Sequence, residues 1–224
     1  MDSDTGTRRA SGPVLVLGAI GLLLLGAVIG VLLRLPLDRG ATEAAPGPVD
    51  IGFSQDMSAH HAQAVDMAGI ALTGSTDNDV RRLAYDILTT QQNQIGRMQG
   101  WLQLWDEPSQ PVDGYMTWMQ SGGHDHGGAK HDMAEGAASM PGMASQAEMT
   151  ALRASSGPAL DTMFLQLMLR HHQGGAPMAE YGAEHAETSA VSMLAAQMSK
   201  AQASESKVMT DMLTARGATP LPLS

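Results

Sequence analysis

The sequence repeats itself at one fixed shift, and this repeat constrains the fold more than any other feature. The shift pairs His60 with His171 (171 − 60 = 111) and brings two copies of one motif, Met-x-x-His-His-x5-Met, into register. Further matches follow downstream: Gln91 with Gln202, Met98 with Met209, and Leu102 with Leu213. Self-similarity over this length indicates two copies of one supersecondary unit.

Each copy has the apolar spacing of two helices joined by a short turn. The predicted helices cover about residues 50–73 and 79–105 in a first hairpin (50–105), and about 158–184 and 188–216 in a second (157–216). Because one hairpin cannot bury its apolar stripe alone, we predict an all-α four-helix bundle over residues 50–216, in which the duplicated hairpins share one core.

A long connection, residues 106–156, joins the two hairpins and is rich in Gly, Pro, Met and His. We expect much of it to be flexible, with residues 115–119 packing back on the bundle. Its composition also indicates metal binding, and the accessory candidates are His124, His126, His131, Met133, Met140 and Met143. A solvated loop without such a role is the alternative interpretation.

Residues 14–33 form an uncharged apolar run, long enough to cross a bilayer as a helix. We interpret this run as a transmembrane helix between a cytoplasmic tail (1–13) and a linker (34–49). A cleaved signal peptide is the alternative, although the run exceeds the usual length of its apolar region. Two arginines on each side leave the topology open, and we expect a single-pass protein of the cell membrane with an extracytoplasmic C-terminal domain.

Composition excludes some partners and ligands. The chain has no cysteine, so disulfides and thiolate metal ligands are excluded. A formal net charge of −10 argues against nucleic acid as a partner. The chain has 17 methionines against two phenylalanines and three tyrosines, and any soft-metal site must therefore take its sulfur from methionine.

The Met and His residues of each motif lie close together on a helix surface. At 100° per residue, Met57, His60 and Met67 share one face and His61 lies beside it. Two imidazoles and two thioethers without a thiolate favour copper(I), with silver as its chemical mimic. The alternative is a core of methionines with incidental polar histidines. Because the motif recurs at matched positions, we predict these metal ligands: Met57, His60, His61, Met67, Met168, His171, His172 and Met178. The sequence leaves open whether they form one site or two.

We do not expect an enzyme. A di-iron bundle needs glutamates at fixed spacing on its helices, and the predicted helix at 50–73 has no glutamate. The sequence also has no cysteine nucleophile, no Gly-x-Ser-x-Gly elbow and no phosphate-binding glycine loop.

Two segments, residues 53–68 (FSQDMSAHHAQAVDMA) and 140–179 (MPGMASQAEMTALRASSGPALDTMFLQLMLRHHQGGAPMA), resemble the domain-of-unknown-function family 305. The resemblance implies a ferritin-like four-helix domain, often duplicated, in exported or membrane-anchored bacterial proteins, some of which bind copper in the periplasm. It implies metal-site roles for the two motifs and for Met140 and Met143. The chain departs from the family at Leu160-Asp161, where a Phe-Asp pair is common. It departs again at Gly175 and Pro177, which predict a kink beside the second histidine pair.

The function expected from these features is a membrane-anchored extracytoplasmic protein that binds copper(I), or silver, for buffering, trafficking or resistance. The alternative is a structural or interaction module of the cell envelope that binds no metal. The sequence names neither a metal-transfer partner nor an oligomeric state.

Overall fold

The computed structural model describes residues 20, 22–30, 44–121, 137 and 139–223. The chain divides into two compact units, Met1–Glu43 and Ala44–Ser224. In the first unit, residues 22–30 are helical. No helix within the described residues combines the length and apolar character needed to cross a membrane. Residues 14–19, 21 and 31–33 of the predicted span lie outside the described residues.

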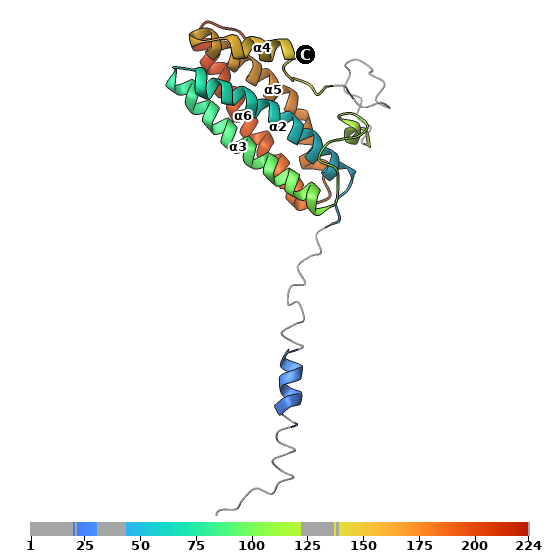
Figure 1. Ribbon diagram of the computed structural model, residues 1–224. Helices are drawn as coiled ribbons and strands as arrows, with labels where there is room; N and C mark the ends of the chain where they lie inside the picture. Colours follow the sequence, from blue (N-terminus) through green and yellow to red (C-terminus); the bar gives the residue numbers. More distant parts are fainter. Residues whose placement is uncertain (1–19, 21, 31–43, 122–136, 138, 224) are drawn as a thin grey trace, which may run out of the picture. The chain divides into compact units, whose positions relative to one another are not determined.

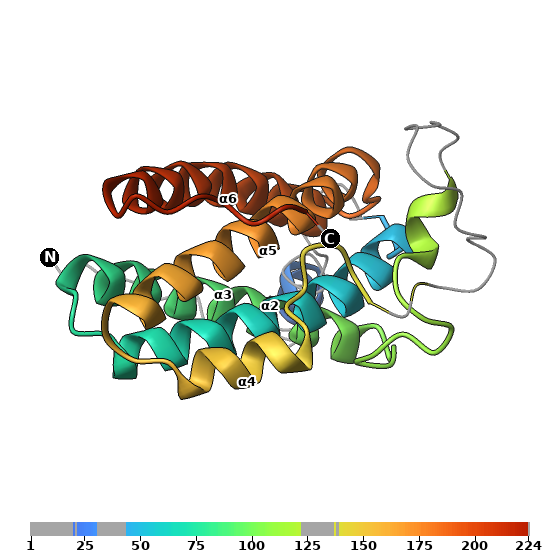
Figure 2. The ribbon, with the colours of Figure 1, turned by 90° about the horizontal axis from the view of Figure 1, so that it is seen from above.

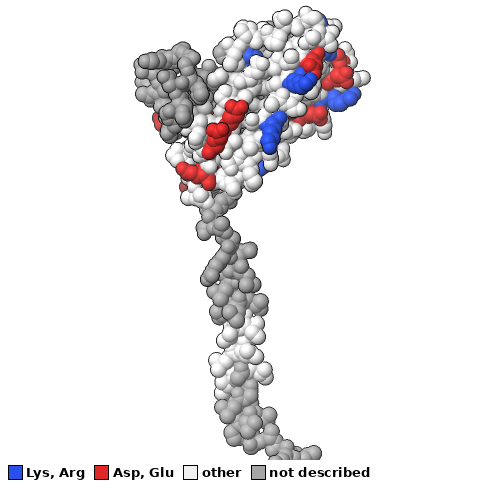
Figure 3. All heavy atoms as spheres, turned by 180° about the vertical axis from the view of Figure 1, so that it is seen from behind, with Lys and Arg blue, Asp and Glu red and all other residues white. Residues whose placement is uncertain are grey.

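Four long helices build the second unit (Figure 1). They are α2 (Pro48–Gly74), α3 (Asn78–Leu104), α5 (Gly157–His185) and α6 (Ser189–Ala215). The central interface is formed by α2 and α5, while α3 packs on α2 and α6 on α5 (Figure 2). On the face shown in Figure 3, acidic and basic side chains lie in small scattered groups, some of which contain both signs. The predicted all-helical bundle is thus confirmed, with helix ends close to the predicted positions.

Side-chain caps explain where several helices begin. The Asp77 carboxylate accepts hydrogen bonds from the backbone N–H groups of Asp79 and Val80 at the start of α3. The Thr188 hydroxyl accepts one from Val191 at the start of α6. Such caps satisfy donors that the first helical turn leaves without partners. The two hairpins therefore turn at positions that the sequence itself marks.

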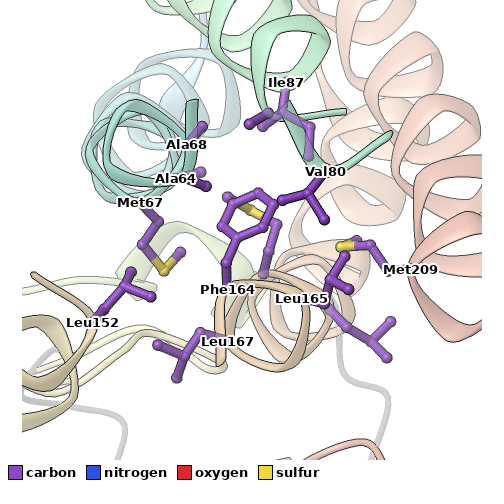
Figure 4. Packing of buried hydrophobic residues seen from close by; sticks show 14 of the residues in the cluster. Ala64, Met67, Ala68, Val80, Ile87, Leu152, Phe164, Leu165, Leu167 and Met209 are labelled. Carbon is purple, nitrogen blue, oxygen red and sulfur yellow. The ribbon is translucent and has the colours of Figure 1, made fainter. Parts of the chain in front are cut away.

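The bundle core consists of two apolar clusters related by the repeat. We call them the Phe53 cluster and the Phe164 cluster, after a matched pair of fully buried rings. Other matched pairs also divide between the clusters, with the Phe53-cluster member first: Met57 and Met168, Met178 and Met67, Met98 and Met209, Val191 and Val80. Figure 4 shows Phe164 surrounded by residues of both hairpins. The repeat therefore gives the bundle an approximate two-fold symmetry with both hairpins in each cluster.

The connection between the hairpins is more ordered than the sequence predicts. Its described part contains a 3₁₀ helix, η1 (Thr117–Ser121), and a further helix, α4 (Gln146–Ala154), which the sequence analysis missed. The expected packing at residues 115–119 is present, since Trp118 is buried in the Phe53 cluster. The glycines and Pro177 of the second copy also leave α5 unbroken from Gly157 to His185.

Candidate metal-binding site

Four histidines meet at the centre of the bundle, in what we call the histidine layer. His60 and His61 come from α2, and His171 and His172 from α5, and each is at most 1% exposed. The rings of His60 and His171 stack with centroids 3.8 Å apart and planes tilted by 33°. Because these two residues are matched by the repeat and touch each other, they lie beside the two-fold axis. The two histidine pairs therefore meet in one layer.

Each histidine uses the same ring nitrogen for hydrogen bonding. The Nε2 atoms of His60 and His171 lie 3.3 Å from the Pro141 carbonyl oxygen and 3.0 Å from the His60 carbonyl oxygen. The Nε2 atoms of His61 and His172 lie 2.8 Å from Gln94 Oε1 and 2.7 Å from Glu205 Oε2. Since all four partners are acceptors, each Nε2 carries the proton and donates it.

The opposite nitrogen, Nδ1, has no hydrogen-bond partner in any of the four rings, although all four atoms are buried. In the Nε2–H tautomer this nitrogen holds the lone pair that binds a metal. Buried polar atoms normally have a hydrogen-bond partner, so four Nδ1 atoms without one in a single layer are unusual. A ring N–H held by an oxygen acceptor, with the other nitrogen free, is also how metal-binding histidines are oriented.

Burial keeps His60, His61 and His171 neutral. Desolvation lowers the pKa of His60 from 6.5 to about 4, and the Pro141 carbonyl opposes this only in part. Desolvation, together with the neighbouring His60, lowers the pKa of His61 to about 3. The pKa of His171 is lowered well below its usual value by desolvation first and then by the other histidines. Neutral imidazole is the form that binds a metal, and these three rings are in that form at neutral pH.

Two amide oxygens add to the unsatisfied polar atoms of this region. Gln91 Oε1 and Gln202 Oε1 are buried without partners, and the repeat matches these residues. A Cβ atom placed on Gly175 would lie 3.3 Å from Gln202 Oε1 and 3.4 Å from His60 Nδ1. The free nitrogen of His60 and the free oxygen of Gln202 therefore both lie close to Gly175, where a side chain would crowd them.

The predicted methionines are buried and are grouped across the hairpins. Met57 and Met178 lie in the Phe53 cluster, and Met67 and Met168 lie in the Phe164 cluster. Each cluster thus contains one of these thioethers from each hairpin, whereas the sequence grouped them within a hairpin. Within the described residues, no three His, Asp or Glu side chains converge in a way that could hold a metal ion.

Only part of the accessory set can be located. Met140 is buried in the Phe53 cluster, and Met143 packs against that cluster. The segment between them reaches the layer through the Pro141 carbonyl beside His60. The other four accessory candidates, His124, His126, His131 and Met133, lie outside the described residues.

The partners of the two outer histidines, Gln94 on α3 and Glu205 on α6, were not predicted from the sequence. The signal was present, because the shift that aligns the two motifs also pairs these positions (205 − 94 = 111). A groove of about 370 Å³ between α3 and α6 also leads to Gln94. Its walls are formed by Thr89, Thr90, Asn93, Gln94, Arg97, Leu194 and Gln197. Gln94 thus contacts the layer through His61 and also lines a groove between α3 and α6.

The donors in and beside the layer suit a soft cation of low charge. They are neutral imidazole nitrogens and thioether sulfurs, whereas hard divalent cations prefer several carboxylate oxygens. Glu205 is the carboxylate that contacts one of the four histidines. The residues present therefore fit copper(I) better than magnesium or calcium.

Comparison with known proteins places this fold in a family. A DUF305 protein of Streptomyces coelicolor is 42% identical, with a TM-score of 0.68, over 78% of this chain and 97% of that one. A DUF305 fragment from Deinococcus radiodurans is 30% identical, with a TM-score of 0.60, over 76% of this chain and 99% of that one. The Cu(II)-bound form of CopM is 26% identical, with a TM-score of 0.55, over 74% of this chain and 95% of that one.

No curated protein matches the chain. The family model described as "Domain of unknown function (DUF305)" matches residues 50–213, which span both hairpins and the connection between them. The two Met-x-x-His-His-x5-Met motifs lie inside this range, and so does every residue of the histidine layer. The chain belongs to the DUF305 family.

Proposed function

We propose that this protein binds copper(I), and silver as its mimic, in the histidine layer and the thioethers beside it. The observation that carries the proposal is the set of four buried imidazoles, each with Nε2 held by an oxygen acceptor and Nδ1 without a partner. A chain without cysteine has imidazole and thioether as its soft donors. The relative CopM, solved in a Cu(II)-bound form, supports copper as the metal.

The proposed role is to buffer or transfer copper outside the cytoplasm, or to confer resistance to it, without catalysis. Residues 14–33 would anchor the protein in the membrane, with the bundle on the extracytoplasmic side. The length and apolar character of this run support the anchor. The His- and Met-rich residues 124–143 would capture the metal and pass it to the bundle, which the contact between Pro141 and His60 supports.

The competing function is an interaction module of the cell envelope that binds no metal. The observation favouring it is that the described residues bring no three His, Asp or Glu side chains into a metal-binding arrangement. The stacked rings of His60 and His171 would then be a polar core layer. A ligand that binds only the folded state raises the melting temperature, whereas this module would not respond to metal.

A competition titration distinguishes the two functions. The full chain in detergent is titrated with copper(I) against a chromophoric chelator, beside a variant with His60, His61, His171 and His172 replaced by Ala. We expect the variant to lose tight binding while circular dichroism shows that its helices persist. His185→Ala is the matched control, because this half-exposed histidine lies outside the layer. Equal affinity in the wild type and the four-histidine variant would contradict copper binding by the layer.

A second comparison separates the bundle from the connection. Replacing His124, His126 and His131 by Ser removes the imidazoles of residues 124–131 and leaves the layer intact. We expect this variant to keep the tightest binding event and to lose only weaker ones, with mass spectrometry counting the bound ions. Loss of the tightest event instead would place the principal site in the connection.

A further inference from the structure

The repeat places one chemical difference beside two otherwise matched histidines. The outer ring of the first hairpin, His61, donates its Nε2–H to Gln94 Oε1 at 2.8 Å. The outer ring of the second hairpin, His172, donates to Glu205 Oε2 at 2.7 Å. Since Gln94 and Glu205 are matched positions, the geometry is preserved and the charge differs by one unit.

This difference matters because the three other oxygen acceptors of the layer, which are two backbone carbonyls and Gln94 Oε1, carry no charge. A monovalent cation held by neutral imidazoles and thioethers leaves a net positive charge in a buried place, and an uncompensated buried charge is costly. A carboxylate that accepts the hydrogen bond of a ligating imidazole offsets this charge and makes the free nitrogen a stronger donor. An amide orients the ring equally well and supplies no charge.

The surroundings increase the contrast between the two sides. Arg97 lines the α3–α6 groove together with Gln94, and its guanidinium lies 5.4 Å from the centre of the Trp101 ring. On the other side, Lys207 lies two residues from Glu205 and pairs with Asp211 at 2.7 Å. A cationic residue therefore lines the groove that reaches Gln94, whereas the acceptor at His172 is an anion that is 22% exposed.

We propose that Glu205 makes the His172 side of the histidine layer the higher-affinity half for a monovalent soft cation, and that Gln94 leaves the His61 side weaker. The inference rests on the proposed copper binding and adds an order of filling to it. Glu205 acts as a positioning residue through His172. The two half-sites then differ in affinity although the repeat makes their ligands the same.

Reciprocal substitutions test the assignment. Copper(I) affinity of the full chain in detergent is measured by chelator competition for the wild type, E205Q, Q94E and the double swap. We expect E205Q to weaken the tightest binding event about tenfold or more, and Q94E to strengthen the weaker event by a similar factor. The double variant, which combines E205Q with Q94E, should again show one tight copper(I) binding event. E180Q is the charge control, because Glu180 is exposed on the same bundle.

A second readout separates positioning from structural support. Glutamine still accepts the hydrogen bond from His172, so the metal-free melting temperature of E205Q should stay close to that of the wild type, while the rise caused by copper(I) becomes smaller. If the wild type binds copper(I) and the affinities of E205Q and Q94E equal that of the wild type, this inference alone is overturned. A loss of affinity in E180Q as large as that in E205Q would also overturn it. A wild type that binds no copper(I) would overturn the proposed function, and this inference with it.

Discussion

At the scale of single residues, the chemistry of the histidine layer comes from burial. An exposed imidazole is partly protonated near neutral pH, whereas His60 and His61 have pKa values of about 4 and about 3 because they are desolvated. The oxygen acceptors at Nε2 then select the tautomer that leaves Nδ1 free. Neutrality and orientation are thus present before any ligand binds, which lowers the cost of organising a site.

The same burial predicts a stability that falls in acid. In the unfolded chain His60, His61 and His171 bind a proton near pH 6.5, whereas in the folded protein their pKa values are well below this, so the unfolded state holds more protons as pH falls below 6.5. The contribution of these three histidines is complete above pH 6.5 and declines as pH falls toward 4. Each of His60 and His61 contributes roughly 2 kcal/mol to the loss at pH 5. Urea unfolding of the metal-free protein at pH 7.5 and pH 5.0 measures the difference.

Substitution checks the origin of this pH dependence. Replacing His60 and His171 together by Leu should flatten the profile, because two of the three strongly shifted groups are removed. The matched control is His185→Leu at a half-exposed position, which should leave the profile steep. Asp56, whose pKa is raised by burial, acts in the opposite direction at lower pH. Equal stability of the wild type at pH 7.5 and 5.0 would contradict burial of neutral histidines.

Gly175→Ala should destabilise the bundle. The added Cβ would lie 2.9 Å from His60 Cε1, and the stacked His171 limits how far that ring can move. We expect a loss of about 1–3 kcal/mol, the usual cost of overpacking a core, measured by urea unfolding at pH 7.5. Gly96→Ala is the control on α3, where nothing lies within 4 Å of the added atom. Its higher helix propensity should raise stability slightly, and equal effects of both substitutions would contradict the close packing.

At the scale of elements, the sequence predicted the long helices well because their ends carry local signals. Caps, prolines and the two-fold repeat place each end within about two residues of its position in the structure. Helix α4 also had a signal, since Ser145 and Glu148 form a capping box at its start. The Gly- and Pro-rich composition of the surrounding connection obscured that signal. Composition over a long window is therefore a weaker guide here than a short capping motif.

The ion pair between Arg170 and Glu148 holds α4 against α5. Two hydrogen bonds of 2.9 and 2.8 Å join the side chains, and the arginine side chain is only 7% exposed. These bonds lower the pKa of Glu148 to about 2. We expect Arg170→Gln to cost about 1–3 kcal/mol and to increase hydrogen exchange at residues 140–154. Such local opening would also free the Pro141 carbonyl from His60.

A second ion pair of α4, which is more exposed, supplies the comparison for the Arg170 pair. Arg153 pairs with Asp66, and both side chains are about half exposed, so Arg153→Gln should cost less than about 1 kcal/mol. The Arg170 contribution should also decline as pH falls from 4.5 toward 2, because Glu148 then takes up a proton. Equal hydrogen exchange in the two variants would show that the Arg170 pair does not hold this segment.

At the scale of the whole molecule, the arrangement of the site was beyond sequence reasoning. The motif placed each Met and His on the correct face, but the register of α2 on α5 decides which methionines meet. Met57 and Met178 share one cluster because the two helices are related by the two-fold axis. The partners Gln94 and Glu205 come from outer helices whose rotation is set by packing and not by local sequence.

The shared core predicts that neither hairpin folds alone. Each apolar cluster takes residues from both hairpins, so an isolated half exposes about half of every cluster and leaves its histidines in water. Fragments 44–121 and 139–224 should each show little helix by circular dichroism, and an equimolar mixture should recover helix and a cooperative melt. The control is the full bundle cut within residues 122–136 after folding, which should remain associated. Cooperative unfolding of either fragment by itself would mean that a hairpin is a complete folding unit, and that the histidine layer forms only when two finished units dock.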